Sequence, residues 1–343
     1  MTRKKLKSKK IYFIAEAGIN HNGSLKNALL LVKKAKVAKA DYVKFQIFKP
    51  NLVSSKNAPL AKYQKKNDKS SSQLEMIKKN SLSYQDFVKI KKFCKKINIK
   101  FLASAFDLDS IKFLKKLKLK EIKIPSGEIN NHYFLKEISK VKRKIFLSTG
   151  MSNLKEIDHA LKILTKYKIK RKDIVIFQCN TAYPTPFEDV NLNCLDTFKN
   201  KYKVKVGFSD HTLGNEAAIA AVAKGAVYIE KHLTLNKKMK GPDHKSSLEL
   251  EEFKSMIKSC NNVNIALGTN KKKLTNSEIE NIKIARRSIV AHKLIKKNTK
   301  FSYRNLTVKR PGTGIKPIYL DKLIGKKSKN NYEIDQLIKS IEL

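Results

Sequence analysis

Two histidines, His211 and His232, each stand at the polar end of a short apolar run of the sequence. Both runs have the length and composition of buried β-strands, and neighbouring strands would bring the two imidazoles to one end of a sheet. Two such imidazoles can share one divalent metal ion. Asp210, Glu230 and Asp243 lie nearby in the sequence, where they could orient ligands or move protons. Two unrelated core or surface histidines are the alternative, and the carboxylates beside both favour the metal pair.

A repeating pattern of strands and helices would position these side chains. Alternating strands and helices predict a parallel sheet. Eight such units in about 250 residues predict a closed (β/α)8 TIM barrel. An open doubly wound sheet is less suitable, because no GxGxxG motif follows the first run. The eight apolar runs, with helical periodicity between them, are 11–17, 41–47, 100–106, 121–127, 144–150, 173–180, 203–210 and 227–234.

Polar residues occur where these runs end, and barrel active sites are built from the carboxyl ends of the strands. Lys44 and Gln46 are two residues apart, so they face the same way. Lys123 is a second charge inside an apolar run, and such charges are costly unless paired. These lysines predict an anion site, with ordinary solvated lysines as the alternative. The polar residues at the strand ends are Glu16, Lys44, Gln46, Ser104, Lys123, Ser126, Glu128, Ser148, Thr149, Asn180, Tyr183, Ser209, His211, Glu230 and His232.

The chain carries an extreme positive charge, with 75 lysines and arginines against 29 aspartates and glutamates and a formal net charge of +46. Such a charge suits a non-catalytic protein that binds nucleic acid or another anionic polymer. However, the charge is mostly lysine and is spread along every expected helix face, which indicates solvated surfaces rather than a polynucleotide site. We therefore expect no nucleic-acid partner, although the field would attract a small anionic substrate.

Nothing in the sequence indicates a membrane or an oxidising compartment. The charged start MTRKKLKSKK resembles the first part of a signal peptide, but the apolar run after it is short, contains Glu16 and lacks a cleavage site. No run approaches transmembrane length. Cys94, Cys179, Cys194 and Cys260 have no metal-ligand spacing and are expected to be free thiols. We expect a cytoplasmic protein with no membrane partner.

Two further segments depart from the barrel pattern. The segment 50–80 is rich in Lys, Ser and Asn, and we expect it to fold over the site. From about residue 271 short β-like runs with frequent turn signals predict a separate module of about 60 residues. There KRPGTGI places Arg310 before a turn, and the pattern alone favours an ordinary exposed arginine. We expect a catalytic barrel at 1–270, a linker at 271–284 and a small β-rich domain at 285–343.

Ten motifs in order resemble those of the bacterial sialic acid synthase family, which makes N-acetylneuraminate and related nonulosonates. They are IAEAGINHNG, VKFQIFK, KIPSGEI, LSTGM, QCNTAYPTPFEDVNL, GFSDHT, IEKHLT, GPDHKSSLE, ARRSIVA and KRPGTGI. The resemblance covers nearly the whole chain. It implies a homodimer in which a C-terminal antifreeze-like (SAF) domain completes the barrel of the partner. The chain departs from the family at Ser104 and Ala105, where Thr and Pro are usual, at Ala182, where many members have Glu, and at Leu233, where Phe is usual.

The resemblance also implies an activity. The family condenses phosphoenolpyruvate with the open-chain form of an N-acetylmannosamine-type sugar and needs a divalent metal, Mn, Co or Mg. The expected enzyme is N-acetylneuraminate synthase. The alternative is an N,N'-diacetyllegionaminate synthase acting on 2,4-diacetamido-2,4,6-trideoxymannose.

The roles of individual residues follow from the same resemblance. His211 and His232 would hold the metal and, with Glu16 and Glu128, are the expected catalytic residues. Arg310 of the other subunit would recognise the N-acetyl group. Glu16, Gln46, Tyr183 and Asp243 would face the sugar, and phosphoenolpyruvate would be surrounded by Lys44, Ser104, Lys123, Ser126, Ser148, Thr181 and Ser209.

Overall fold

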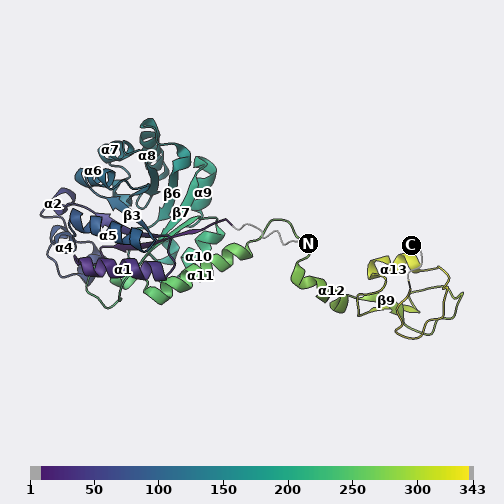
Figure 1. Cartoon of the computed structure of the whole chain (residues 1–343). Coiled ribbons are helices and arrows are strands. Elements are labelled where there is room, and N and C mark those ends of the chain that lie inside the picture. Colours follow the sequence, from purple (N-terminus) through teal and green to yellow (C-terminus); the bar gives the residue numbers. More distant parts are fainter. Residues whose placement is uncertain (1–8, 340–343) are drawn as a thin grey trace. The chain divides into compact units, whose positions relative to one another are not determined.

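A computed structural model describes residues 9–339 of the chain (Figure 1). The chain divides into two compact units, Met1–Gly268 and Thr269–Leu343, and this division falls close to the expected end of the barrel domain. The outer ends of both expected domains, residues 1–8 and 340–343, lie outside the described residues, as does most of the stretch MTRKKLKSKK. Among the described residues, no helix combines the length and the apolar character that crossing a membrane requires.

The first unit is a closed barrel of eight parallel strands in sequential order, in which β1 pairs with both β2 and β8. The expected TIM barrel is therefore confirmed, and each expected run overlaps one strand. The fourth strand ends at Ile124 rather than at residue 127, because Pro125 has no N–H for the ladder. The strands are β1 (Tyr12–Gly18), β2 (Tyr42–Ile47), β3 (Lys100–Ala105), β4 (Glu121–Ile124), β5 (Lys144–Ser148), β6 (Ile174–Cys179), β7 (Lys205–Asp210) and β8 (Tyr228–His232).

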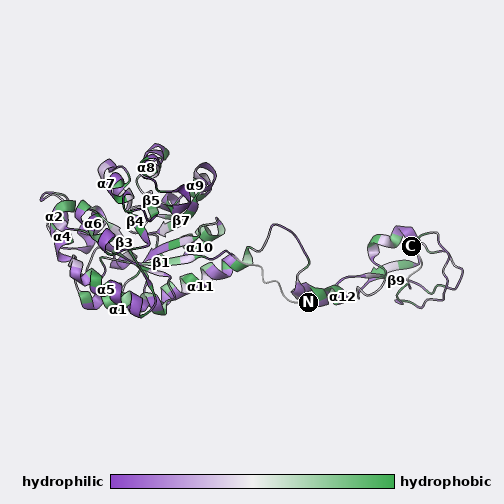
Figure 2. Ribbon diagram, turned by 45° about the horizontal axis from the view of Figure 1, so that its top comes forward, coloured by the Kyte–Doolittle hydropathy of each residue, from purple (hydrophilic) through white to green (hydrophobic). Residues whose placement is uncertain are grey.

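Helices follow the strands and cover the outside of the barrel (Figure 1). Several begin at a Ser, Asp or Asn whose side chain accepts a hydrogen bond from a backbone N–H in the first turn, as Ser24, Ser83 and Asp107 do. Hydrophobic and hydrophilic residues alternate along them, as one buried face requires (Figure 2). The main helices of this unit are α1 (Leu25–Val37), α5 (Tyr84–Lys96), α6 (Leu108–Lys116), α7 (His132–Ser139), α8 (Leu154–Lys166), α9 (Cys194–Tyr202), α10 (Glu216–Ala223) and α11 (Leu250–Ala266).

The turns that lead from these helices into the next strand share one backbone feature. In most of them a residue just after the helix has a positive φ, a conformation that glycine adopts without strain. This chain has only 12 glycines, and lysine or asparagine occupies these positions instead. The residues concerned are Lys39, Asn98, Lys118, Lys142, Lys168 and Lys203.

The barrel interior is apolar at its amino end and polar at its carboxyl end. A buried cluster fills the amino end and includes Ile14, Tyr42, Phe146, Phe177 and Tyr228. Because side chains alternate along a strand, the residues that follow Tyr228 inward on β8 are Glu230 and His232. The apolar cluster therefore forms a floor, and the charged and polar residues lie above it at the carboxyl ends of the strands.

The segment 50–80 is not a plain loop, since it contains three short helices between β2 and α5. These are α2 (Pro50–Val53), α3 (Lys62–Asn67) and α4 (Gln73–Lys79). Short 3-10 helices occur elsewhere in the unit at η1 (Ser126–Glu128), η2 (Arg171–Asp173), η3 (Phe187–Asp189) and η4 (His244–Ser246).

The second unit has its own small core, which includes Ile289, Ile295, Phe301, Leu323 and Tyr332. Its sheet is a two-stranded antiparallel pair, so the expected β-rich module is present. The segment expected as a linker, 271–284, contains a 3-10 helix and most of an α-helix. The elements of this unit are η5 (Asn276–Glu278), α12 (Ile279–Ala285), β9 (Ser288–Ala291), β10 (Leu306–Lys309), η6 (Pro317–Tyr319) and α13 (Leu320–Leu323).

Candidate active site

A cavity of about 480 Å³ opens at the carboxyl ends of the barrel strands. The segment 50–80 contributes Tyr63, Gln64 and Gln73 to its wall, so the expectation that this segment folds over the site is confirmed. Most of the side chains that the sequence singles out come together here from all eight strands or the residues just after them. They are Glu16, Lys44, Gln46, Ser104, Lys123, Ser126, Ser148, Thr181, Tyr183, Ser209, His211 and His232.

Two buried lysines and two buried carboxylates form a network at the bottom of the cavity. Lys44 Nζ lies 2.9 Å from Glu16 Oε2 and 3.6 Å from Glu230 Oε1. Lys123 Nζ lies 3.0 Å from Glu230 Oε2. Ser209 Oγ donates to Glu230 Oε1 at 2.9 Å. Glu230 thus links both lysines.

Burial disfavours the charged forms of all four groups, and the ion pairs oppose this effect. For Lys44 the neighbouring carboxylates prevail over burial and raise the pKa, whereas for Lys123 burial prevails and lowers the pKa. Burial acts against ionised Glu230 too, but attraction to Lys123 and Lys44 lowers its pKa to about 2. Burial raises the pKa of Glu16 to about 7 in spite of Lys44. The two lysines therefore favour the ionised form of Glu230, whereas the pKa of Glu16 lies near neutral pH, as suits a group that exchanges protons.

The position of Lys123 depends on an aromatic ring and on a glycine. Lys123 Nζ lies 3.6 Å from the centroid of the Phe177 ring, within the range of a cation–π interaction. The Phe177 ring in turn fills the space beside Gly207 on β7, where a Cβ atom would lie 2.6 Å from the ring. Only glycine at position 207 leaves room for the ring that supports the ammonium group.

The His211 imidazole is held in one tautomer. Its Nδ1 donates to the backbone carbonyl of Asn180, which can only accept. Nε2 is therefore the unprotonated nitrogen, and it lies 3.3 Å from Tyr183 Oη and 3.4 Å from Ser209 Oγ. Burial lowers the pKa of His211 to about 4, so the ring is neutral at physiological pH. A neutral imidazole with one nitrogen fixed by a backbone carbonyl is a typical metal ligand.

His232 completes a pair that fits a divalent metal as two of its ligands. The two imidazole rings lie 5.4 Å apart between centroids. Burial lowers the pKa of His232 well below its usual range, and its Nδ1 is buried without a hydrogen-bond partner. Among the described residues, no group of three or more His, Cys, Asp or Glu is arranged to hold a metal. The remaining ligands of a metal here would have to be water and substrate oxygens, which leaves coordination positions open for chemistry.

Hydroxyl groups and one thiol line the side of the cavity around the lysines. Ser104 Oγ is buried without a hydrogen-bond partner. Ser126 Oγ accepts from the Gly150 N–H at 3.0 Å and lies 3.1 Å from Cys179 Sγ. A hydroxyl without a partner, in a cavity that two ammonium groups also line, is a suitable donor for phosphate and carboxylate oxygens.

Three of the expected catalytic and substrate-binding residues lie elsewhere. Glu128 is half-buried, accepts from Asn131 Nδ2 at 2.8 Å and does not line the cavity. Asp243 lines a neighbouring cavity instead. Arg310 is an exposed residue of the second unit, where its Nε donates to the Ala285 carbonyl at 3.0 Å.

The expected role of Asp210 as a partner of the histidines is wrong. Its carboxylate pairs at 2.7 Å with Lys231, and both side chains are fully buried. Ser209 and Glu230 line the 480 Å³ cavity, which we call the reaction cavity. The alternation of side chains therefore turns their neighbours Asp210 and Lys231 to the other face of the sheet.

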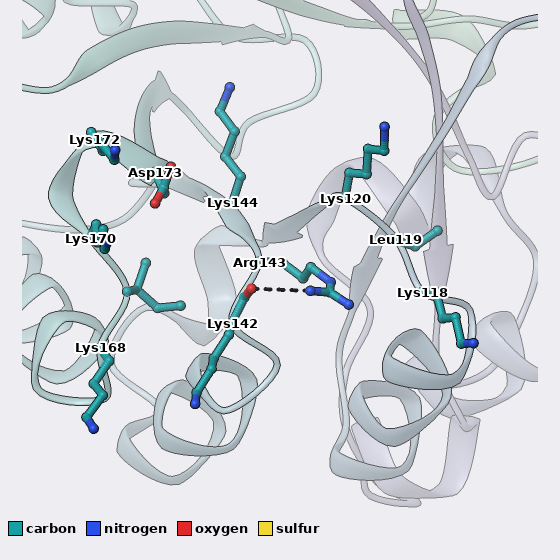
Figure 3. A pocket seen from close by; sticks show the side chains of 11 residues that line it. Lys118, Leu119, Lys120, Lys142, Arg143, Lys144, Lys168, Lys170, Lys172 and Asp173 are labelled. Atoms are coloured by element: carbon teal, nitrogen blue, oxygen red, sulfur yellow. Dashed lines mark hydrogen bonds between the residues drawn. The ribbon is translucent and has the colours of Figure 1, made fainter.

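A second large cavity, of about 630 Å³, lies at the amino ends of β4, β5 and β6 (Figure 3). The sequence analysis expected lysines spread over the surface, but here three separate turns gather them into one cavity. These turns follow the C-terminal ends of α6, α7 and α8, where positive charge offsets the negative end of each helix dipole. Its lining offers one carboxylate and no imidazole or thiol, so it suits no acid–base or metal chemistry. The charged residues are Lys118, Lys120, Lys142, Arg143, Lys144, Lys168, Lys170, Lys172 and Asp173.

Comparisons with known proteins agree over most of the chain. The NeuB family model matches residues 31–273, and the SAF domain model matches residues 286–340. An N,N'-diacetyllegionaminic acid synthase of Campylobacter jejuni is 47% identical over 334 residues, covering 96% of this chain and 99% of that protein. The enzyme of the same name from Legionella pneumophila is 38% identical over 323 residues, covering 93% and 91%. The crystal structure of an N-acetylneuraminic acid synthetase from Leptospira borgpetersenii has a TM-score of 0.70 and 29% identity, covering 82% of this chain and 94% of that chain.

Proposed function

Given that this chain belongs to the NeuB family of nonulosonic acid synthases, we propose that it is an N,N'-diacetyllegionaminate synthase. It would condense phosphoenolpyruvate with 2,4-diacetamido-2,4,6-trideoxymannose. Two relatives with this printed name are 47% and 38% identical to the chain, against 29% for the N-acetylneuraminic acid synthetase. N,N'-diacetyllegionaminate therefore has better support as the product than N-acetylneuraminate, which the sequence analysis placed first.

The observation that best supports this proposal is the arrangement of charges in the reaction cavity. Phosphoenolpyruvate has a phosphate and a carboxylate, and Lys44, Lys123 and a set of hydroxyls line the same cavity. On binding, its anionic groups would take over contacts that the lysines now make with Glu16 and Glu230. The network thus keeps both ammonium groups charged and in place before the substrate arrives.

In the proposed reaction, carbon 3 of phosphoenolpyruvate bonds to the sugar aldehyde carbon, water adds to carbon 2, and phosphate leaves with cleavage of its C–O bond. His211 and His232 would hold a divalent metal, which when bound supplies Lewis acidity toward the aldehyde. The Glu16 carboxylate is suitable for accepting the proton of the attacking water, because its pKa of about 7 is near the working pH. Tyr183, beside His211, would orient the sugar.

The test is phosphate release by the purified protein with phosphoenolpyruvate and each of the two sugars, after chelation and after addition of Mn²⁺. We expect turnover only with metal, and a higher kcat/KM for the diacetamido sugar than for N-acetylmannosamine. Absence of phosphate release with the diacetamido sugar, or preference for N-acetylmannosamine, would contradict the proposal.

Histidine variants test the assignment of the metal ligands. His211→Ala or His232→Ala should abolish turnover while the circular dichroism spectrum and the unfolding transition persist. His159→Ala, at an exposed position on α8, is the matched control and should retain activity. Turnover by either site variant would overturn the assignment.

The homodimer with an exchanged SAF domain is also part of the proposal. Arg310, exposed in the second unit, would then contact the sugar bound to the other subunit. Arg310→Ala should raise the KM for the sugar and leave the KM for phosphoenolpyruvate unchanged. An unchanged sugar KM would argue against this role.

A further inference from the structure

A smaller cavity of about 220 Å³ adjoins the reaction cavity, and we call it the side cavity. The two cavities share part of their walls, so they lie side by side. The shared wall consists of three glutamine amides and three aromatic rings, from Gln46, Gln64, Gln73, Tyr63, Phe106 and Tyr183.

The part of the side cavity that is not shared is apolar. Much of it comes from the segment 50–80, since Val53 lies on α2, and Met76 and Ile77 lie on α4 (Figure 1). The exception is Asp243, and burial raises the pKa of this carboxyl to about 7. The other apolar residues of the lining are Ile19, Phe48 and Pro242.

Tyr183 borders the side cavity and also lies beside His211, one of the two expected metal ligands. Its hydroxyl lies 3.3 Å from His211 Nε2, its ring lies 5.1 Å from the Tyr63 ring between centroids, and it lines both cavities. A sugar whose aldehyde carbon lies at the two histidines has five more carbons to place. The floor of the barrel and the lysine network close the cavity below, which leaves the direction past Tyr183 among those open to the sugar chain.

We propose that the side cavity receives the far end of the sugar, with the acetamido group on carbon 4 and the methyl carbon 6 against Val53, Met76 and Ile77. This inference rests on the proposed function and adds its specificity-determining residues. The glutamine amides at the shared wall are suitable partners for the acetamido N–H and C=O, and the apolar residues beyond them suit the two methyl groups. N-acetylmannosamine carries a hydroxyl on carbon 6, which would lose its hydration against Val53, Met76 and Ile77.

The experiment compares two enlargements on the same short helix. Val53→Trp fills the side cavity, whereas Leu52→Trp places the same ring on the adjacent, exposed position that lines neither cavity. We expect Val53→Trp to lower kcat/KM for the diacetamido sugar by roughly 10- to 200-fold, the range for losing a fitted apolar contact. N-acetylmannosamine should lose less, because it lacks the two methyl groups placed against Val53. The KM for phosphoenolpyruvate and all constants of Leu52→Trp should change by less than about threefold, within ordinary surface effects.

A second variant protects the test against misfolding. Ile77→Asn places an amide among the apolar side chains without adding volume, and should also reduce kcat/KM selectively for the diacetamido sugar. Equal losses for both sugars, or no loss in either folded variant, would overturn the proposal.

Separate measurements test the proposed function and the proposed role of the side cavity. Turnover of the unmodified protein tests the proposed function alone. Calorimetric binding of the diacetamido sugar, without phosphoenolpyruvate, tests the side cavity without turnover. Weaker binding to Val53→Trp than to Leu52→Trp would support the side cavity even if the protein did not catalyse the reaction. Equal binding to both variants would overturn it.

Discussion

Replacement of Glu230 by Gln is the sharpest test of the lysine network. This carboxylate is buried and contacts both Lys44 and Lys123, at 3.6 and 3.0 Å. Gln has nearly the same shape but no charge. The variant would therefore keep two buried ammonium groups, with Glu16 still beside Lys44 and with Lys123 deprived of its carboxylate partner.

The size of the effect follows from the geometry. At an effective dielectric constant of about 20, unit charges 3.0 and 3.6 Å apart attract each other by roughly 5 kcal/mol per pair. Desolvation of Glu230 opposes this attraction, and breaking one buried pair typically costs about 3–5 kcal/mol. We expect Glu230→Gln to lower the free energy of unfolding by about 3–5 kcal/mol. Each kcal/mol lost should lower the Tm by roughly 2–4 °C.

Thermal unfolding with and without saturating phosphoenolpyruvate is the suitable assay. The anion would supply the negative charge that the variant lacks, so it should raise the Tm of Glu230→Gln more than that of the unmodified protein. Glu128→Gln is the control, since Glu128 is half-buried and has Asn131 as its hydrogen-bond partner. It should change the stability by less than about 1 kcal/mol.

Two results would refute this reasoning. A loss of stability no greater for Glu230→Gln than for Glu128→Gln would show that the lysines do not depend on the shared carboxylate. An equal shift of Tm by phosphoenolpyruvate in the variant and the unmodified protein would show that the anion does not replace it.

Three further predictions concern stability. Asp210→Asn leaves the Lys231 ammonium group buried without its carboxylate and should lower the free energy of unfolding in urea by about 3–5 kcal/mol. The double variant Asp210→Leu with Lys231→Met should have nearly unchanged stability. Equal losses of stability in the two variants would contradict the ion-pair account. Lys168→Gly, at φ 71°, should stabilise the protein by about 1 kcal/mol, and a lower urea midpoint would count against backbone strain there. Because burial raises the pKa of Asp243 from 3.8 to about 7, its neutral form stabilises the fold at low pH and this contribution is lost as the pH rises from about 4 to about 7. Asp243→Asn should therefore gain stability over the unmodified protein across that window, by up to roughly 4 kcal/mol, and a constant difference would contradict it.

The sequence predicts the barrel well because the alternation of apolar runs and amphipathic helices is local. The rule that polar residues at strand ends form the site brings Lys44, Lys123, His211 and His232 into one cavity. The same alternation of side chains should have excluded Asp210, since Ser209 and Asp210 cannot both face the interior.

Other features of the site have no signal in the spacing of residues. Lys44, Lys123 and Glu230 lie on β2, β4 and β8, and their pairing depends on which side chains meet across the barrel interior. The segment 50–80 shows polar composition only, so nothing in it identifies Tyr63, Gln64 or Val53 as cavity residues. The basic cavity at the amino end combines residues from three turns that are far apart in the sequence.

Gly207 shows that an active site can depend on a residue that makes no contact with a substrate. It has no side chain to bind a substrate, yet its lack of a Cβ lets the Phe177 ring lie where it meets Lys123. An inventory of substrate contacts would omit both residues. In redesign of this enzyme for another sugar, glycine at position 207 must therefore be retained together with the residues of the anion site.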